Sequence, residues 1–148
     1  MKIEHITRPL KITHSANDNT TKLLLVKRGR QRAAPSRHCM ATVTTERNEL
    51  LTNSQEFISA LESILEKEQV TCLGYVNHDF DNKSFTTVVG LAESHISVHT
   101  WPERSAVQLD VFLCNYIHDN TAKCQRIFDA ITEYFDPQKV DATYLERF

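Results

Sequence analysis

The chain has 148 residues, of which 41% are hydrophobic and only three are glycine. This composition suits one hydrophobic core and excludes a second full domain. No apolar run approaches the roughly 18 to 20 residues that span a bilayer, and the N-terminus lacks the apolar stretch of a secretory signal, so we expect a soluble, cytoplasmic protein without a membrane partner. The four cysteines show neither C-x-x-C spacing nor the density of a disulfide scaffold, which favours reduced thiols.

The net charge of -2 conceals an asymmetry between the ends of the chain. Residues 1–37 hold nine Lys/Arg and two Asp/Glu, a balance of +7, whereas residues 38–148 carry -9. This basic, largely polar composition predicts a mostly disordered N-terminal extension over residues 1–37. Its cluster at residues 27–32 could serve as a targeting segment or lie on the acidic body, but a solvated tail is favoured and no nucleic-acid partner is expected.

The remainder, residues 38–148, reads as one folded domain that starts with a strand. Asn53, followed three residues later by Glu56, predicts a helix start, and apolar residues at helical spacing extend to about Gln69. A second helix is expected from Asp119 or Asn120 until Pro137 stops it. The expected strands share β-branched or alternating apolar residues and are residues 38–43, 70–77, 85–93, 94–101, 106–114 and 140–145.

The predicted element order is β-α-β-β followed by β-β-α-β, which favours an α+β fold, a two-layer sandwich of one sheet and two helices. The apolar face of the fifth strand, which the helices should cover, is formed by Val107, Leu109, Val111 and Leu113. Polar and reactive residues would then fall on the opposite face of the sheet. A site or a partner must cover that face.

Chemistry is concentrated in residues 93–103, which hold two histidines, two serines, two carboxylates and the only tryptophan. If this segment is extended, alternation predicts two different faces. One face would carry Ser94, Ile96 and Val98. The other would carry His95, Ser97, His99 and Trp101.

Several functions are compatible with this segment on spacing alone. His95 and His99 with Cys114 could bind zinc, but no compact fourth ligand is present and we expect no metal. A serine hydrolase is disfavoured because Ser94 lacks the G-x-S-x-G elbow. Hydrogen-bonding surface residues on an edge strand remain as open a possibility as catalysis.

Three groups of residues in order carry a resemblance to a known family: Glu93-Ser94-His95, then His99-Thr100-Trp101-Pro102-Glu103, then Asp110-Val111-Phe112 with Cys114. They resemble the signature of the bacterial and archaeal S-adenosylmethionine decarboxylase proenzymes, which make their own pyruvoyl cofactor. The resemblance covers about residues 37–148, including Arg37-His38 and the loop His78-Asp79-Phe80. The first 36 residues have no counterpart.

The resemblance implies that the precursor cuts itself between Glu93 and Ser94. Ser94 would attack the carbonyl of Glu93 and convert the amide into an ester. β-Elimination would then free a chain ending at Glu93 and leave a dehydroalanine, which hydrolyses to a pyruvoyl group at position 94. His99 would be the proton acceptor of this processing. It would be supported by the hydroxyl of Thr86, at a position where relatives commonly have serine.

The resemblance also implies the reaction and the substrate. The pyruvoyl carbonyl would form a Schiff base with the α-amine of S-adenosylmethionine and withdraw electrons as carbon dioxide leaves. Cys114 would return a proton to the α-carbon, and the product would be an aminopropyl donor for spermidine biosynthesis. The implied substrate-binding residues are Glu103 for the ribose hydroxyls, with Phe80, His78 and Trp101 as aromatic contacts. A homodimer of cleaved protomers is expected.

Some positions depart from the family pattern. Thr42 stands in place of an active-site glutamate, Asn115 in place of a glycine, and Arg104-Ser105 in place of an aromatic-glycine pair. These changes leave open a pyruvoyl-dependent decarboxylase of ornithine or arginine. A non-catalytic regulatory paralogue is a third hypothesis, against which the intact reactive residues argue.

Overall fold

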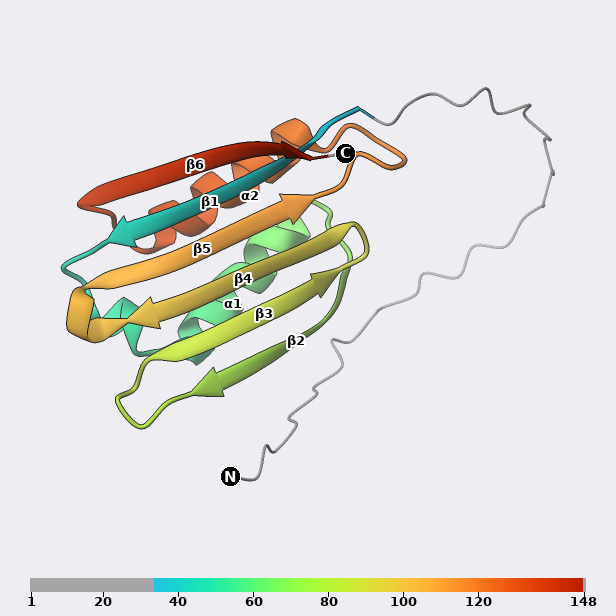
Figure 1. Ribbon diagram of the computed structural model, residues 1–148. Coiled ribbons are helices and arrows are strands. Elements are labelled where there is room, and N and C mark those ends of the chain that lie inside the picture. The colour runs from blue at the N-terminus through green and yellow to red at the C-terminus, as the bar shows by residue number, and fades with distance from the viewer. Residues whose placement is uncertain (1–33, 148) are drawn as a thin grey trace, which may run out of the picture.

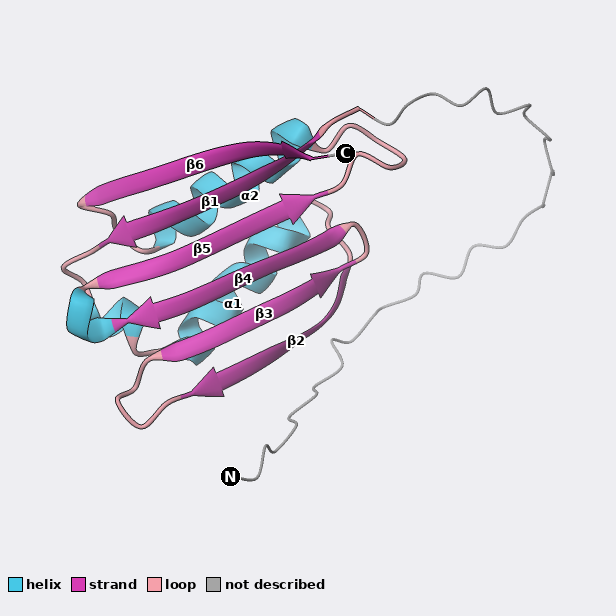
Figure 2. Ribbon diagram, in the orientation of Figure 1, coloured by secondary structure: helices cyan, strands magenta, loops and turns pink. Residues whose placement is uncertain are grey.

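The computed structural model describes residues 34–147. In this part of the chain six strands form one antiparallel sheet, and two α-helices cover one of its faces (Figure 1). The strands are β1 (Ser36–Thr44), β2 (Cys72–Asp79), β3 (Phe85–Leu91), β4 (Ser94–Trp101), β5 (Ala106–Leu113) and β6 (Lys139–Arg147). The helices are α1 (Ser54–Lys67) and α2 (Thr121–Tyr134), with short 3-10 turns η1 (Asn48–Leu51) and η2 (Pro102–Arg104). The strand order is β2-β3-β4-β5-β1-β6. The expected two-layer α+β sandwich is confirmed (Figure 2).

Helix α1 begins where the sequence predicts. The side-chain oxygen of Asn53 accepts a 3.1 Å hydrogen bond from the backbone N–H of Glu56, as an N-cap should. The Glu56 carboxylate accepts from the Asn53 side-chain amide rather than from its backbone, so the capping box is only half formed. Phe57, Leu61 and Leu65 then form a buried stripe against the sheet.

Helix α2 starts one residue after Asn120 and ends before Pro137, which also agrees with the prediction. Its buried face belongs to the same core as α1. The α2 residues in this core, with the residue that follows the helix, are Cys124, Ile127, Phe128, Ile131 and Phe135.

The strands alternate between the core and an open face, as period-2 geometry requires. On β5, the four apolar residues that the sequence assigned to the helix side are all buried. On β4, Ile96 and Val98 are buried in the core, while His95, Ser97 and His99 are partly accessible on the other side. The reactive face predicted from the sequence is therefore present, and no described element covers it (Figure 1).

Several element boundaries differ from the prediction by one to two residues, among them those of β1 and β2. Strand β1 begins at Ser36, so Ser36 and Arg37, assigned to the extension by composition, belong to the sheet. The Arg37 guanidinium also donates to Gln125 of α2, which explains why this end of the strand is ordered by tertiary contacts. Strand β2 starts two residues later than expected and reaches Asp79. Residues 1–33 of the expected disordered extension lie outside the described residues.

No helix within residues 34–147 is long and apolar enough to cross a membrane.

Candidate active site

The residues singled out in the sequence lie at the two ends of β4. Glu93, Ser94 and Cys114 gather at its beginning, where β3, β4 and β5 meet. Thr86, His99 and the aromatic residues gather at its other end. Ser94 and His99 are five residues apart on one strand, which corresponds to roughly 16 Å at about 3.3 Å per residue. The two groups of residues therefore do not meet within one chain.

Ser94 follows a two-residue turn, Ala92 and Glu93, that joins β3 to β4. Its φ of 143° lies in a region that non-glycine residues rarely adopt, at a typical cost of about 1–3 kcal/mol. The register pairs Ser94 with the buried residues Leu91 and Leu113, in agreement with the predicted alternation along this strand. Ser94 itself is half-buried, and its hydroxyl oxygen lies 3.2 Å from Nδ1 of His95.

The carbonyl of Glu93, which precedes Ser94, is hydrogen-bonded to the next strand. The backbone N–H of Cys114 donates to this oxygen over 2.9 Å. The carbonyl of Cys114 accepts from the side-chain amide of Asn120 over 2.8 Å. Both backbone groups of Cys114 are thus fixed, and its half-buried thiol is held at the edge of the site.

Asn115 anchors the loop after Cys114 from within the protein. It is buried, its backbone N–H donates to the hydroxyl of Ser36, and its side-chain amide donates to the carbonyl of Pro35 and the hydroxyl of Thr121. Its side-chain oxygen accepts from the N–H of Asn120. A glycine here could make none of the side-chain contacts, so this departure from the family pattern supports the loop.

The other thiols occupy different surroundings. Cys39 and Cys124 are buried between β1 and α2 with their sulfur atoms 3.9 Å apart. The hydrogen bond between them, together with burial, raises the pKa of Cys39 far above its usual value, so this thiol stays protonated. All four cysteines are free, as the spacing in the sequence predicts.

At the far end of β4, His99 pairs with Thr86 of β3 across the sheet. The hydroxyl of Thr86 is hydrogen-bonded to Nδ1 of His99. Both residues line a cleft of about 630 Å³, together with Phe80 and Trp101. This pairing of a hydroxyl with a histidine was expected only from the family resemblance, and the register of β3 and β4 produces it.

The candidate substrate residues are only partly brought together. His78 and Phe80 lie edge to face with ring centres 4.6 Å apart, and Phe80 faces the cleft. The guanidinium of Arg104 lies 5.1 Å from the centre of the Trp101 ring. Glu103 is exposed on η2 and does not line this cleft. Thr42 lies on the open face, where it lines a neighbouring cleft of about 440 Å³ with His99 and Asp141.

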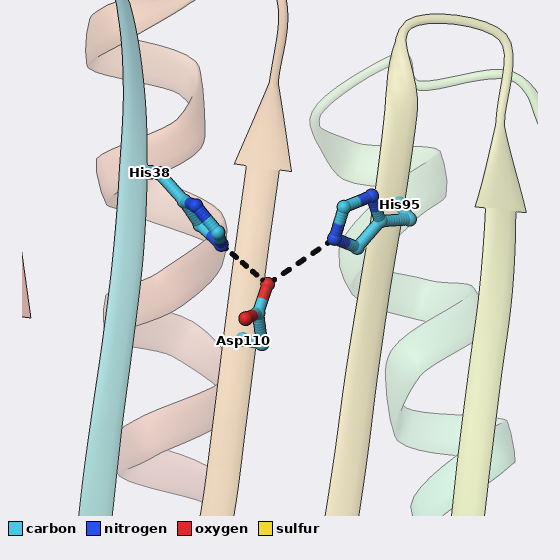
Figure 3. A group of neighbouring side chains, drawn as sticks. All are labelled: His38, His95 and Asp110. Carbon is cyan, nitrogen blue, oxygen red and sulfur yellow. Dashed lines mark hydrogen bonds and ion pairs between the residues drawn. The ribbon is translucent and has the colours of Figure 1, made fainter. Parts of the chain in front are cut away.

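The zinc hypothesis built on His95, His99 and Cys114 fails on distance. Along a strand, positions i and i+4 are separated by roughly 13 Å, so His95 and His99 cannot share one ion. His95 instead lies beside two residues that the sequence analysis did not assign to a site, His38 of β1 and Asp110 of β5 (Figure 3). No sequence spacing indicates this group, because it depends on β1 lying next to β5.

Comparisons with known proteins show the family of this chain. The family model described as S-adenosylmethionine decarboxylase matches residues 37–148. The chain belongs to the S-adenosylmethionine decarboxylase family. The matched range begins one residue after the start of β1 and runs to the end of the chain, so the whole described fold is the family domain.

Relatives within the S-adenosylmethionine decarboxylase family are identical to this chain at about a third of the aligned positions. The S-adenosylmethionine decarboxylase proenzyme of Archaeoglobus fulgidus is 33% identical over 111 residues, covering 75% of this chain and 96% of the relative. That of Hydrogenobaculum sp. is 30% identical over 110 residues, covering 74% and 79%. The crystal structure of the adenosylmethionine decarboxylase from Aquifex aeolicus superposes with a TM-score of 0.68 at 27% identity, covering 77% of this chain and 91% of that one.

Proposed function

We propose that this chain is a proenzyme that cuts itself between Glu93 and Ser94 and then decarboxylates S-adenosylmethionine with a pyruvoyl group formed at position 94. The product would be an aminopropyl donor for spermidine biosynthesis. Family membership supports the substrate class, and the proenzyme names of the relatives support self-cleavage. The geometry around the Glu93–Ser94 bond supports the position of the cut.

The observation that carries the proposal is the hydrogen bond from the Cys114 N–H to the Glu93 carbonyl oxygen. When the Ser94 hydroxyl attacks this carbonyl, negative charge develops on the oxygen. A fixed N–H donor at 2.9 Å stabilises that charge, as the donors of an oxyanion hole do. Attack converts the amide into an ester. Loss of the Ser94 α-proton then expels the Glu93 carboxylate from the Ser94 β-carbon, which separates the two fragments, and the dehydroalanine left at position 94 takes up water and releases ammonia to give the pyruvoyl group.

The backbone at Ser94 favours this bond as the one to break. The positive φ stores strain on the order of 1–3 kcal/mol in the intact chain. That strain is released when the bond between Glu93 and Ser94 is cut. The turn therefore destabilises the precursor relative to the cleaved chain.

The residues at this end of β4 fit a pyruvoyl group. Such a group supplies an electron sink for the departure of carbon dioxide. Cys114 would deliver a proton to the substrate α-carbon, because its backbone is fixed beside position 94 by the bonds to Glu93 and Asn120. Cys114 is half-buried, so part of its surface remains accessible.

The processing role of His99 requires a second copy of the chain. His99 and Thr86 lie roughly 16 Å along β4 from Ser94. A homodimer whose two-fold axis lies between the open faces would bring the His99 end of one chain over the Ser94 end of its partner. Exposed apolar residues support burial of this face, since the cross-strand neighbours Val76 and Val88 are 56% and 44% exposed.

The same arrangement would place the substrate between the chains. The cleft lined by Phe80 and Trp101 offers aromatic surfaces for adenine or for the sulfonium cation. His78 supports the Phe80 ring from its edge. Glu103 would accept hydrogen bonds from the ribose, after a rotation toward the cleft.

Mass spectrometry of the purified protein tests the proposal. The wild-type chain should yield fragments of 93 and 55 residues, with a pyruvoyl group blocking the N-terminus of the smaller one, whereas Ser94→Ala should remain at 148 residues. The cleaved protein should release labelled carbon dioxide from carboxyl-labelled S-adenosylmethionine. A fully active wild-type chain that is not cut would refute the proposal.

A further inference from the structure

Asp110 lies between two histidines on the open face of the sheet (Figure 3). One of its carboxylate oxygens is 2.6 Å from Nε2 of His38 and 3.3 Å from Nε2 of His95. The side chains of Asp110 and His95 are partly accessible, and that of His38 is nearly buried. The three residues come from β5, β4 and β1, which are adjacent in the sheet.

The second nitrogen of His95 contacts the nucleophile of the cleavage reaction. Nδ1 of His95 lies 3.2 Å from the hydroxyl oxygen of Ser94. A carboxylate beside Nε2 favours the tautomer that carries its proton there. Nδ1 then has a free lone pair and accepts the Ser94 hydroxyl proton. This is the order serine, histidine, carboxylate, with the two ring nitrogens exchanged relative to the familiar triad.

Asp110 is hydrogen-bonded to His38, and His38 in turn contacts Arg147 of β6. The guanidinium of Arg147, at the end of β6, lies 3.4 Å from Nδ1 of His38 and can only donate there. His38 must therefore carry its proton on Nε2 and donate it to Asp110. The guanidinium is fixed over the ring of Phe112, at 4.6 Å from its centre. The orientation of the Asp110 carboxylate thus depends on β1 and β6 as well as on β5.

We infer that His95 is the general base for the first step of self-cleavage, and that Asp110 and His38 are positioning residues that hold it in the competent tautomer. This inference rests on the proposed self-cleavage at Ser94. It assigns the two steps of that reaction to two histidines. His95 serves the attack by the Ser94 hydroxyl, and His99 of a second copy serves the later elimination.

The proton balance of the first step requires no further reactant. The Ser94 hydroxyl gives its proton to Nδ1 of His95 as its oxygen bonds to the Glu93 carbonyl carbon. His95 then returns this proton to the Ser94 nitrogen as the carbon–nitrogen bond breaks. The result is an ester between the Glu93 carboxyl and the Ser94 side chain, with a free amino group at Ser94.

A metal ion is a poorer explanation of the same three residues. Their ligand atoms lie within 4.8 Å of one another, so an ion could be considered. Ligands about 2.0–2.2 Å from zinc in a tetrahedral site are separated by roughly 3.4 Å. The 2.6 Å contact between His38 and Asp110 is instead a hydrogen bond. Arg147 also brings a cation to the remaining nitrogen of His38.

The test follows cleavage of the full-length chain made by cell-free translation, so that the precursor is observed before it matures. His95→Gln should lower the first-order rate of cleavage by about 100-fold or more, the usual contribution of a general base. His118→Gln, a matched change in the exposed loop after β5, should cleave at the wild-type rate. Added imidazole should partly restore cleavage to His95→Ala.

Hydroxylamine distinguishes the two steps, because it cleaves an ester and leaves an amide intact. The His95→Gln precursor should resist hydroxylamine, since it never forms the ester. The His99→Gln precursor should be cut by it, since the ester accumulates. A general folding defect would make both precursors resistant.

A substitution of Asp110 tests its positioning role separately. Asp110→Asn removes the carboxylate that favours the proton on Nε2 of His95, so the rate of cleavage should fall at least tenfold and the uncut precursor should resist hydroxylamine. Asp110→Glu keeps a carboxylate on this strand and should restore part of the rate. The other charged groups nearby, His38, Arg147 and Glu93, remain in both variants.

Opposite results would overturn the roles of His95 and Asp110 one by one. Cleavage of His95→Gln at the wild-type rate, or accumulation of hydroxylamine-sensitive ester in it, removes His95 from the first step. Cleavage of Asp110→Asn at the wild-type rate removes the positioning role, and loss of cleavage in the presence of a chelator would make the cluster a metal site. Failure of the wild-type chain to cut, or cutting of Ser94→Ala, would instead refute the proposed function.

Discussion

The backbone N–H of Cys114 donates a hydrogen bond to the carbonyl oxygen of Glu93. This bond joins the residue proposed as the proton donor of decarboxylation to the peptide proposed as the site of cleavage. It is made by the main chain, so it survives any substitution of the Cys114 side chain except proline. The two proposed roles of this position are therefore separable by mutation.

Cys114→Ala should cleave normally and lose decarboxylation. The backbone donor to Glu93 remains, whereas the thiol that returns a proton to the α-carbon is gone, so turnover should fall by about 100-fold or more. Gel analysis of cleavage and release of labelled carbon dioxide measure the two effects. Cys39→Ala and Cys72→Ala serve as controls and should show only a loss of stability of about 1 kcal/mol from packing. Unchanged turnover in Cys114→Ala would exclude the thiol from the mechanism.

Mixing of two inactive chains should restore cleavage if the site is shared between protomers. His99→Gln alone should stop at the ester, and Ser94→Ala alone has no nucleophile. When the two are expressed together, Ser94→Ala supplies an intact His99 and Thr86 to its partner, so part of the His99→Gln chains should be cut. The products are separated on denaturing gels with a tag on one chain. No cutting in a mixed dimer verified by pull-down would argue that His99 acts within its own chain.

Substrate choice should favour S-adenosylmethionine over ornithine and arginine. The cleft beside His99 presents aromatic rings, whereas a basic amino acid would need an acid such as Asp141 for its distal cation. Release of carbon dioxide from the three carboxyl-labelled compounds at equal concentration gives the comparison. Glu103→Gln should raise KM for S-adenosylmethionine about tenfold or more by weakening charge-assisted hydrogen bonds to the ribose. Faster release from ornithine or arginine, reduced by Asp141→Asn, would reverse the assignment.

An ion pair between the helices predicts an acid-dependent loss of stability. Nε and Nη2 of Arg126 on α2 both donate to the carboxylate of Glu68 at the end of α1, and this contact lowers the pKa of Glu68 in the folded chain. A lowered pKa stabilises the fold at pH values above the unfolded pKa of about 4.3, and the contribution is lost as pH falls through the folded value. Glu68→Gln should therefore lower the urea midpoint at pH 7 and have little effect near pH 3. Glu62→Gln, an exposed change on the same helix, should show no such difference.

The element order could be predicted from the sequence because each element carries its own local signal. Asn53 with Glu56 marks one helix start, and alternation on β5 marks its buried face. The arrangement of β1 between β5 and β6 has no local signal, since it joins segments far apart in the chain. For this reason Ser94, Cys114 and His99 were found from the sequence through family resemblance, whereas His38 and Asp110 were not assigned to a site.

The failure of the zinc hypothesis has a related cause. The spacing of His95 and His99 would bring two side chains together on a helix, but on a strand it separates them by roughly 13 Å. The same rise per residue separates Ser94 from His99. This second distance could have been anticipated once the segment was predicted to be extended, and it would have indicated that Ser94 and His99 do not meet within one chain.

The position of β1 also determines what a cut at Ser94 does to the molecule. Residues 1–93 contribute β1, β2 and β3, and residues 94–148 contribute β4, β5 and β6, yet β1 lies between β5 and β6 and is paired along its length with both. The two fragments therefore share one sheet. Separation of β1 from the second fragment would break its hydrogen bonds to β5 and to β6 at the same time. The two fragments of a cut chain should therefore stay associated without a covalent link and separate only in denaturant. After denaturation the two fragments would have to meet by diffusion, so refolding of the cut protein should depend on protein concentration. Folding of the uncut chain would not depend on such an encounter between fragments.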